Sequence, residues 1–120
     1  MSIETTFEKI GEIAATELLW FYFDQNNSGG RFVQDENVGE GVLVQDFSAE
    51  KAIERAREFM DNSDSCPCCG DRWSPEYVKD EDGTRDPLIY DKPLSEWKPF
   101  HHNGYCVLHH FGGKVTRYPE

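Results

Sequence analysis

Residues 18–25 read L-L-W-F-Y-F-D-Q, and this aromatic run is the clearest indication of the fold. Aromatic and aliphatic side chains favour extended structure, so the run predicts a well-buried β-strand. N-N-S-G-G (26–30) follows, and because Asn and Gly tolerate positive φ it predicts a turn. We expect R-F-V-Q-D (31–35) to return as a second strand and G-V-L-V-Q-D-F (41–47) to form a third. Together these segments predict an antiparallel meander.

An amphipathic helix is predicted over about 48–61, directly after the third strand. Ser48 is a good N-cap. The apolar residues behind it recur at the spacing of one helix face, and charged residues occupy the opposite side. We expect this stripe to cover one face of the sheet. It consists of Ala49, Ala52, Ile53, Ala56, Phe59 and Met60.

The rest of the chain predicts shorter elements. Residues 74–87 are polar and turn-rich and predict a loop, whereas Leu88-Ile89-Tyr90 predicts a short strand. Asn103-Gly104 and Gly112-Gly113 are hairpin signals. Towards the other end, residues 1–17 predict a weakly helical N-terminal extension, because apolar residues recur there at three- and four-residue steps.

The expected architecture is a single α+β domain over residues 18–120. It contains an antiparallel sheet of five to six strands in a meander, one amphipathic helix packed on it, and a zinc-knuckle-like turn. A chain of 120 residues fits one domain. We expect Tyr90, Trp97, Phe100 and Tyr105 to line its core.

The charge of the chain restricts its partners. The formal net charge is −11, from 23 acidic and 12 basic residues, which makes nucleic acid an unlikely partner since phosphate contacts need Lys and Arg. The acidic surface is either that of an ordinary soluble protein or one that binds a basic partner, for example by imitating DNA.

No apolar run reaches the roughly 18 residues of a membrane span. M-S-I-E (1–4) lacks the pattern of a signal peptide, so we expect a cytosolic protein without membrane contact.

Three of the four cysteines lie in S-C-P-C-C-G-D-R-W (65–73). Cys66, Cys69 and Gly70 form a C-P-x-C-G pattern that is typical of a zinc-ribbon knuckle, where two thiolates reach one ion. A structural zinc site needs two more ligands. If Asn103-Gly104 is a two-residue hairpin turn, His101 and Cys106 lie opposite each other on neighbouring strands and supply them.

The predicted metal site is therefore a closed, structural zinc on Cys66, Cys69, His101 and Cys106. Three alternatives stay open. Zinc can be held by another set that includes Cys66 and Cys69, with Cys68 as a further candidate. The cluster can also be a metal-free turn with reduced thiols, or a redox-active C-x-x-C.

Two further segments are candidate binding sites. The first is an amide-rich loop whose N–H groups could bind an anion, with Arg31 supplying charge, although a flexible hairpin loop explains it equally. The second is Asp71-Arg72-Trp73, which is either an interface hot spot or an internal Asp–Arg pair beside a core Trp. The amide-rich loop comprises Gln25, Asn26, Asn27, Ser28, Gly29 and Gly30.

A resemblance links these motifs. F-x-F-x-Q-N-N-S-G-G-x-F-V (21–33), the S-A-E-x-A helix start (48–52) and C-x-C-C-G-D-R-W (66–73) are similar to a family of small, uncharacterised proteins of tailed bacteriophages. The resemblance covers residues 20–73 well and the tail loosely. It implies a phage protein in the cytosol of a bacterial host, and carries no activity.

The leading functional hypothesis is a non-enzymatic phage accessory protein that binds a host protein, for example a defence component. The sequence has neither G-x-S-x-G nor H-E-x-x-H, so an enzyme is the less expected class. The first alternative is a nucleotide-binding or nucleotide-sequestering protein that uses the amide-rich loop and Arg31. The second alternative is a metal-dependent hydrolase.

Overall fold

The computed structural model describes residues 17–27, 30–63, 65–68 and 70–119. The predicted N-terminal helix, apart from Glu17, lies outside the described residues. So do three candidate site residues, Ser28, Gly29 and Cys69.

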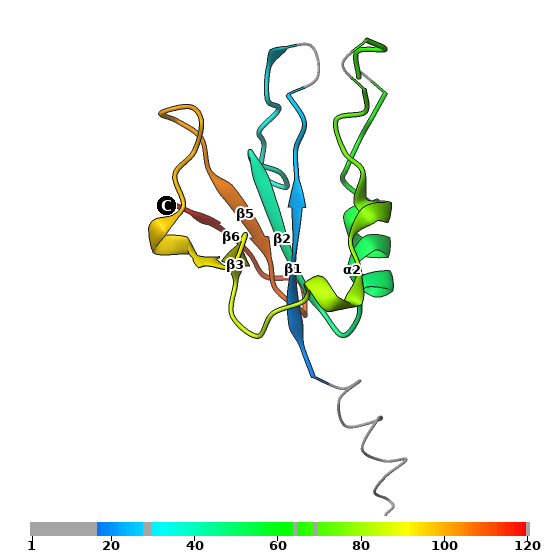
Figure 1. The fold of residues 1–120 in the computed structure, drawn as a ribbon, viewed down its shortest axis with the longest axis vertical. Coiled ribbons are helices and arrows are strands. Elements are labelled where there is room, and N and C mark those ends of the chain that lie inside the picture. Colours follow the sequence, from blue (N-terminus) through cyan, green and yellow to red (C-terminus); the bar gives the residue numbers. More distant parts are fainter. Residues whose placement is uncertain (1–16, 28–29, 64, 69, 120) are drawn as a thin grey trace, which may run out of the picture.

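The main sheet has four strands in the order β1-β2-β5-β6 (Figure 1). Its strands are β1 (Leu19–Asp24), β2 (Gly41–Asp46), β5 (Cys106–His109) and β6 (Val115–Tyr118). β1 pairs antiparallel with β2, β5 pairs antiparallel with β6, and the central β2–β5 pair is parallel. A separate two-stranded hairpin consists of β3 (Leu88–Ile89) and β4 (Lys92–Pro93). The fold is thus α+β with a mostly antiparallel sheet, whereas the predicted single meander of five to six strands is wrong.

The predicted strand over 31–35 does not form, and the Gln25 side chain explains why. Its Nε2 donates to the carbonyls of Val33 (3.0 Å) and Gly39 (2.6 Å), and its Oε1 accepts from the Val33 N–H (2.7 Å). A buried side chain thus satisfies backbone groups that a neighbouring strand would otherwise bond. The segment can therefore stay irregular while being held against the sheet.

The Asn103-Gly104 hairpin is also absent. The Gly104 N–H does donate to the His101 carbonyl (2.9 Å), which closes a turn, but no strand leads directly into this turn. Cys106 instead lies opposite Gly41 of β2 and Tyr118 of β6. The cross-strand neighbours predicted for His101 and Cys106 are therefore wrong, because the long connection brings β5 alongside β2. The other hairpin signal is confirmed, since Gly112 and Gly113 adopt positive φ between β5 and β6.

Helix α2 (Ala49–Ala56) begins where the sequence predicts and is shorter than predicted. The Ser48 hydroxyl accepts from the Lys51 N–H, which confirms the N-cap. Ala49, Ala52 and Ala56 are buried against the sheet, so the apolar stripe packs as expected.

Two hydrophobic clusters occupy the two faces of the sheet, because successive β1 side chains point to opposite sides. On the face covered by α2, Phe21 and Phe23 pack with Trp73. On the other face, Trp20 packs with Ile89 of β3. The sheet is thus the middle of three layers, with α2 and the β3–β4 hairpin on opposite sides (Figure 1). Within the described residues, no helix is both long and apolar enough to cross a membrane.

Candidate functional site

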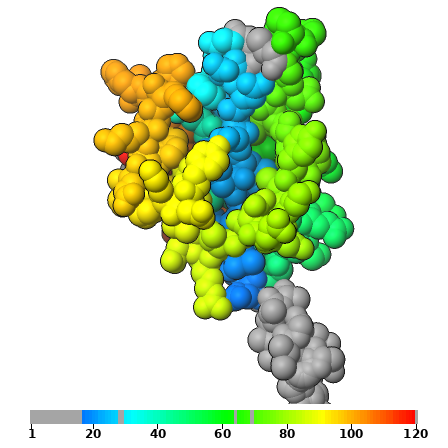
Figure 2. Space-filling model, viewed as in Figure 1, coloured from blue at the N-terminus to red at the C-terminus, as the bar shows by residue number. Residues whose placement is uncertain are grey.

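A cleft of about 1110 Å³ opens at the end of β1, between the segments that cover the two faces of the sheet. Its floor comes from residues 22–27, one wall from residues 71–78, and the opposite wall from Tyr90 and residues 97–101. Figure 2 shows the β1 region (blue) between the wall near residue 75 (green) and the wall from about 90 to 101 (yellow to orange). Three segments that are far apart in the chain therefore meet here.

Exposed aromatic side chains line the cleft. The exposed fractions are 73% for Tyr77, 69% for Tyr90 and 86% for Phe100. Phe32 stacks on the Phe100 ring with 5.8 Å between the ring centroids. The expectation that Tyr90 and Phe100 line a core is therefore wrong, although Trp97 does pack partly buried against the second hydrophobic cluster.

Asp24 lies on the floor between two tyrosines. The Tyr90 hydroxyl donates to Asp24 Oδ2, and Tyr22 also shares a hydrogen bond with the Asp24 side chain. The Tyr22 and Tyr90 rings meet edge to face, with centroids 5.4 Å apart. Burial and the Asp24 carboxylate raise the pKa of Tyr22, and burial followed by the Asp24 hydrogen bond raises the pKa of Tyr90 to about 12. Both phenols are therefore protonated donors at neutral pH.

Glycine at position 41 makes room for this arrangement. Gly41 lies opposite Asp24 in the β1–β2 pair. A Cβ at this position would lie within 2.4 Å of the Tyr22 hydroxyl oxygen, so no other residue fits without displacing that ring. The side chain of Tyr22 can therefore run along β1 towards Asp24.

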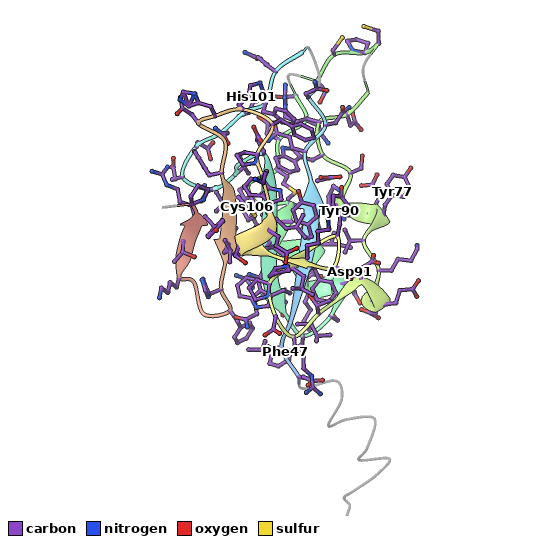
Figure 3. The ribbon with its side chains drawn as sticks, turned by 60° about the vertical axis from the view of Figure 1, so that its left-hand side comes forward. Phe47, Tyr77, Tyr90, Asp91, His101 and Cys106 are labelled. Carbon is purple, nitrogen blue, oxygen red and sulfur yellow. The ribbon has the colours of Figure 1, made fainter. Side chains whose placement is uncertain are left out.

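The β3–β4 turn holds Tyr90 at the edge of the cleft. Tyr90 (φ 52°) and Asp91 (φ 66°) are consecutive residues in the left-handed region, as in the type I′ turns that suit two-residue hairpins. Such angles are unfavourable for a residue with a Cβ, and Asp tolerates them better than Tyr. The pairing of β3 with β4 maintains this turn and directs Tyr90 towards β1 (Figure 3).

Glu40 fixes the loop that carries Phe100 and His101. Its buried carboxylate accepts the N–H groups of Phe100 (2.7 Å) and His101 (2.9 Å). It also contacts His101 Nδ1 at 3.0 Å. One buried side chain at the start of β2 thus determines the course of a loop sixty residues further along the chain.

Arg72 joins the amide-rich loop to the wall formed by residues 71–78. Only 2% of Arg72 is exposed, and its Nη1 donates to the Arg31 carbonyl (2.9 Å) and to Gln25 Oε1 (3.3 Å). The Asn26 N–H donates to the Arg72 carbonyl (2.9 Å), and Asn26 Nδ2 to the Asp71 carbonyl (3.2 Å). The two candidate binding segments are therefore neighbours.

Within these two segments, the described residues take different roles. Gln25, Arg72 and Trp73 are buried, and the bond between Gln25 and Arg72 holds the loop against the 71–78 wall. Asn26, Asn27, Gly30, Arg31 and Asp71 are exposed. Asn26, Asn27 and Asp71 line the cleft, whereas Arg31 does not.

The four predicted zinc ligands are not brought together among the described residues. Cys106 is fully buried in the second hydrophobic cluster, and this burial raises the pKa of its thiol to about 12. His101 is exposed and bonded to Glu40, at a different place in the molecule (Figure 3). Cys66 Sγ lies 3.0 Å from Cys68 Sγ. In the part of the chain that the structure describes, no group of three or more His, Cys, Asp or Glu side chains is placed to hold a metal ion. Because Cys69 lies outside that part, zinc binding stays a prediction.

Sequence reasoning missed the residues that form the cleft's chemistry: Asp24, Glu40, Tyr77 and Tyr90. Asp24 had a weak signal, because Trp20, Tyr22 and Asp24 alternate along one face of a predicted strand. No sequence signal marks Glu40 or Tyr77, since their roles depend on contacts with segments that are distant in the chain.

A profile described as "Domain of unknown function (DUF7296)" matches residues 18–120. The chain belongs to this family. The DUF7296 domain thus begins just before β1 and includes every residue of the cleft. No curated protein and no solved structure matches the chain significantly.

The DUF7296 cleft has the features of a recognition site. Its lining includes the carboxylates of Asp24, Glu40, Asp71 and Asp82 against three basic residues, Arg72, Lys98 and His101. Arg72 is buried and donates to a backbone carbonyl and to Gln25. The open part of the cleft thus combines exposed aromatic rings with carboxylates, which suits an apolar or cationic ligand better than an anion.

Proposed function

We propose that this DUF7296 domain is a non-enzymatic accessory protein of a tailed bacteriophage, and that its cleft binds a segment of a host protein, for example a defence component. The observation that carries the proposal is the cleft at the end of β1, lined by exposed Tyr77, Tyr90 and Phe100. The motif resemblance to tailed-phage proteins supports a host protein as the partner.

The physical argument rests on exposed rings around a concave surface. Large aromatic side chains are normally buried, and their gathering in one exposed area is typical of an interaction site. Tyrosine is enriched among residues that dominate binding energy, because it buries much area and loses little rotamer freedom. A volume of about 1110 Å³ exceeds what most small ligands need, and an extended segment would fill it.

The charge of the cleft supports a cationic segment. Carboxylates line it on a protein whose net charge is −11, so a positively charged partner would be attracted both at long range and on contact. The same charges disfavour a nucleotide. Arg31, which the nucleotide hypothesis needs, lies outside the lining of this cleft.

The proposal is tested by capturing a partner with the intact chain and then removing the aromatic rings. A protein retained from bacterial lysate is identified, purified and titrated by calorimetry against wild type and the Tyr77→Ser/Phe100→Ser double variant. Both residues are mostly exposed, so the variant should fold, which its thermal unfolding checks. We expect binding to weaken by about tenfold or more, in line with the loss of interface hot spots.

Phe111→Ser is the matched control, because Phe111 is an exposed ring that does not line the cleft. It should bind the partner as wild type does. Equal binding by the double variant and wild type would refute the proposal. Thermal-shift measurements with nucleotides test the alternative: a bound nucleotide at 100 times its dissociation constant adds about 2.7 kcal/mol to stability.

A further inference from the structure

Asp24 is a carboxylate at the bottom of an aromatic cleft, and its surroundings point to the chemistry of the ligand. We propose that the cleft recognises an arginine or lysine side chain, which inserts between the walls and pairs with Asp24 beside the Tyr90 ring. This inference rests on the proposed function and names the kind of segment that the cleft accepts.

Asp24 keeps capacity for a further donor. An ionised carboxylate offers about four lone-pair positions, and the hydroxyls of Tyr22 and Tyr90 occupy two of them. Asp24 is itself exposed, so an entering cation can reach it. A guanidinium or ammonium group is a donor without acceptors, and charge-assisted bonds to a carboxylate are stronger than neutral ones.

Two other carboxylates in the lining, those of Glu40 and Asp82, already have structural roles. Glu40 is buried and accepts from the Phe100 and His101 backbone and from the His101 ring. Asp82 Oδ2 accepts from the Lys79 N–H (2.9 Å). Asp24 differs, since its described partners are two phenols that remain protonated and leave its charge uncompensated. It is therefore a better anchor for a cation than Glu40 or Asp82.

The rings beside Asp24 favour the same ligand. A cation over an aromatic face is attracted by the ring quadrupole. Tyr90 is 69% exposed, so part of its ring is accessible from the cleft while its hydroxyl stays bonded to Asp24. The T-shaped contact with Tyr22 and the β3–β4 turn hold the ring in place before a ligand arrives. Such preorganisation reduces the entropy that binding has to overcome.

Three peptides of eight residues test the inference on the intact ¹⁵N-labelled chain. One alternates Arg with Pro, one alternates Lys with Pro, and the third replaces Arg by citrulline, its neutral counterpart. Proline keeps each peptide extended and can pack on exposed rings. At low salt, we expect the Arg and Lys peptides to shift the amide signals of residues 22–25 and 89–92 and the indole signal of Trp97. The citrulline peptide should bind at least about tenfold more weakly.

Asp24→Asn should weaken binding of the Arg peptide by about tenfold or more, since the charged partner is lost while the shape is kept. Glu54→Gln is the control, because it removes the same charge from an exposed position on α2 outside the cleft. It should stay within about twofold of wild type, because the removed charge lies outside the cleft and makes no direct contact with a cation bound there. Three results would each overturn the inference. The Asp24→Asn variant could bind the Arg peptide as tightly as wild type does, the citrulline peptide could bind as tightly as the Arg peptide, or no peptide could shift the amide signals.

A failure of this inference can be distinguished from a failure of the proposed function. If the captured partner loses affinity through Tyr77→Ser/Phe100→Ser but not through Asp24→Asn, the cleft is an interaction site and only the cation specificity is wrong. If the double variant has no effect on the partner, the proposed function itself fails, whatever the peptides do.

Discussion

Two buried charged residues determine the walls of the cleft. Arg72 ties the segment after the cysteine cluster to the loop between β1 and β2, and Glu40 ties the loop before β5 to the start of β2. The Arg72 side chain donates to one backbone carbonyl and to Gln25, and the Glu40 carboxylate accepts two backbone N–H groups, so each buried charged group has hydrogen-bond partners. Asp24, by contrast, is exposed and bonded to side chains, as the proposed contact with a cation requires.

Arg72→Met should lower the free energy of unfolding by about 2 to 4 kcal/mol. The substitution removes the hydrogen bonds to the Arg31 carbonyl and to Gln25 Oε1, so the Arg31 carbonyl loses this donor and Gln25 Oε1 keeps only the Val33 N–H. Urea titration of the intact chain measures the difference. Arg57→Met is the control, since the Arg57 guanidinium is largely exposed and its 4.0 Å contact with Glu76 is weak. A loss for Arg72→Met no larger than that of the control would show that Arg72 does not hold the wall.

Strand β5 also carries residues that lie away from the cleft and connect the sheet to the segments packed on its α2 side. His109 is buried on the side of α2, where its ring stacks on Phe59 (4.1 Å between centroids) and its Nε2 contacts the Asn37 carbonyl at 2.7 Å. Nε2 is therefore the donor in this contact. A neutral imidazole is sufficient for this hydrogen bond, and burial disfavours the protonated, positively charged form.

The stability contributed at His109 should depend on pH. Burial lowers the pKa of His109 and outweighs the opposite effect of the Asn37 hydrogen bond, while Arg55 and His110 lower the pKa further. The unfolded chain thus binds the proton more readily than the folded one. The contribution is complete above the ordinary pKa near 6.5 and decreases as the pH falls below it. Urea midpoints between pH 7.5 and 5 should therefore fall more steeply for wild type than for His109→Gln, which retains a donor for Asn37.

Carboxylates elsewhere in the chain also begin to titrate towards pH 5, so the difference between the two proteins is the informative quantity. His110→Gln serves as the comparison. The pKa of His110 is lowered by burial too, but this residue is only partly buried on the neighbouring turn. Parallel pH profiles for wild type and His109→Gln would contradict the expected coupling.

The charge of the complete chain opposes its compact state. With 23 acidic and 12 basic residues, like charges repel one another more strongly in the folded protein than in the expanded one. The same surplus of carboxylates at the cleft would attract a cationic partner. Stability and binding should therefore respond to salt in opposite directions.

Raising NaCl from about 20 mM to 300 mM should increase the urea midpoint, because the Debye length shortens to below about 10 Å and screens the repulsion. The Glu54→Lys/Glu58→Lys variant tests the cause. Each substitution adds two positive units, so the net charge becomes −11 + 4 = −7. The salt response of this variant should be smaller than that of wild type. A midpoint that is independent of salt, or an equal response in both proteins, would exclude charge repulsion as the cause.

Much of the local structure could be predicted from residue patterns. The strands at 18–25 and 41–47, the Ser48 cap, the apolar stripe of α2 and the Gly112-Gly113 turn all follow from propensities that act over a few residues. The predicted strand at 31–35 failed because the Gln25 side chain, rather than a strand, bonds that segment. Nothing in the local sequence distinguishes a glutamine that bonds a distant backbone from one that faces solvent.

The sequence by itself determined the strands at 18–25 and 41–47, the helix start at Ser48 and the acidic character, because side-chain periodicity, capping and charge are properties of neighbouring residues and of composition. Only the tertiary structure decided that β5 lies parallel to β2, that Cys106 is buried away from His101, and that Asp24, Tyr77 and Tyr90 share one cleft. Contacts between segments tens of residues apart depend on how the layers pack as a whole. The candidate site of this domain is therefore a product of packing, and the amide-rich loop and the Asp71-Arg72-Trp73 segment contribute to it mainly by holding one wall in place.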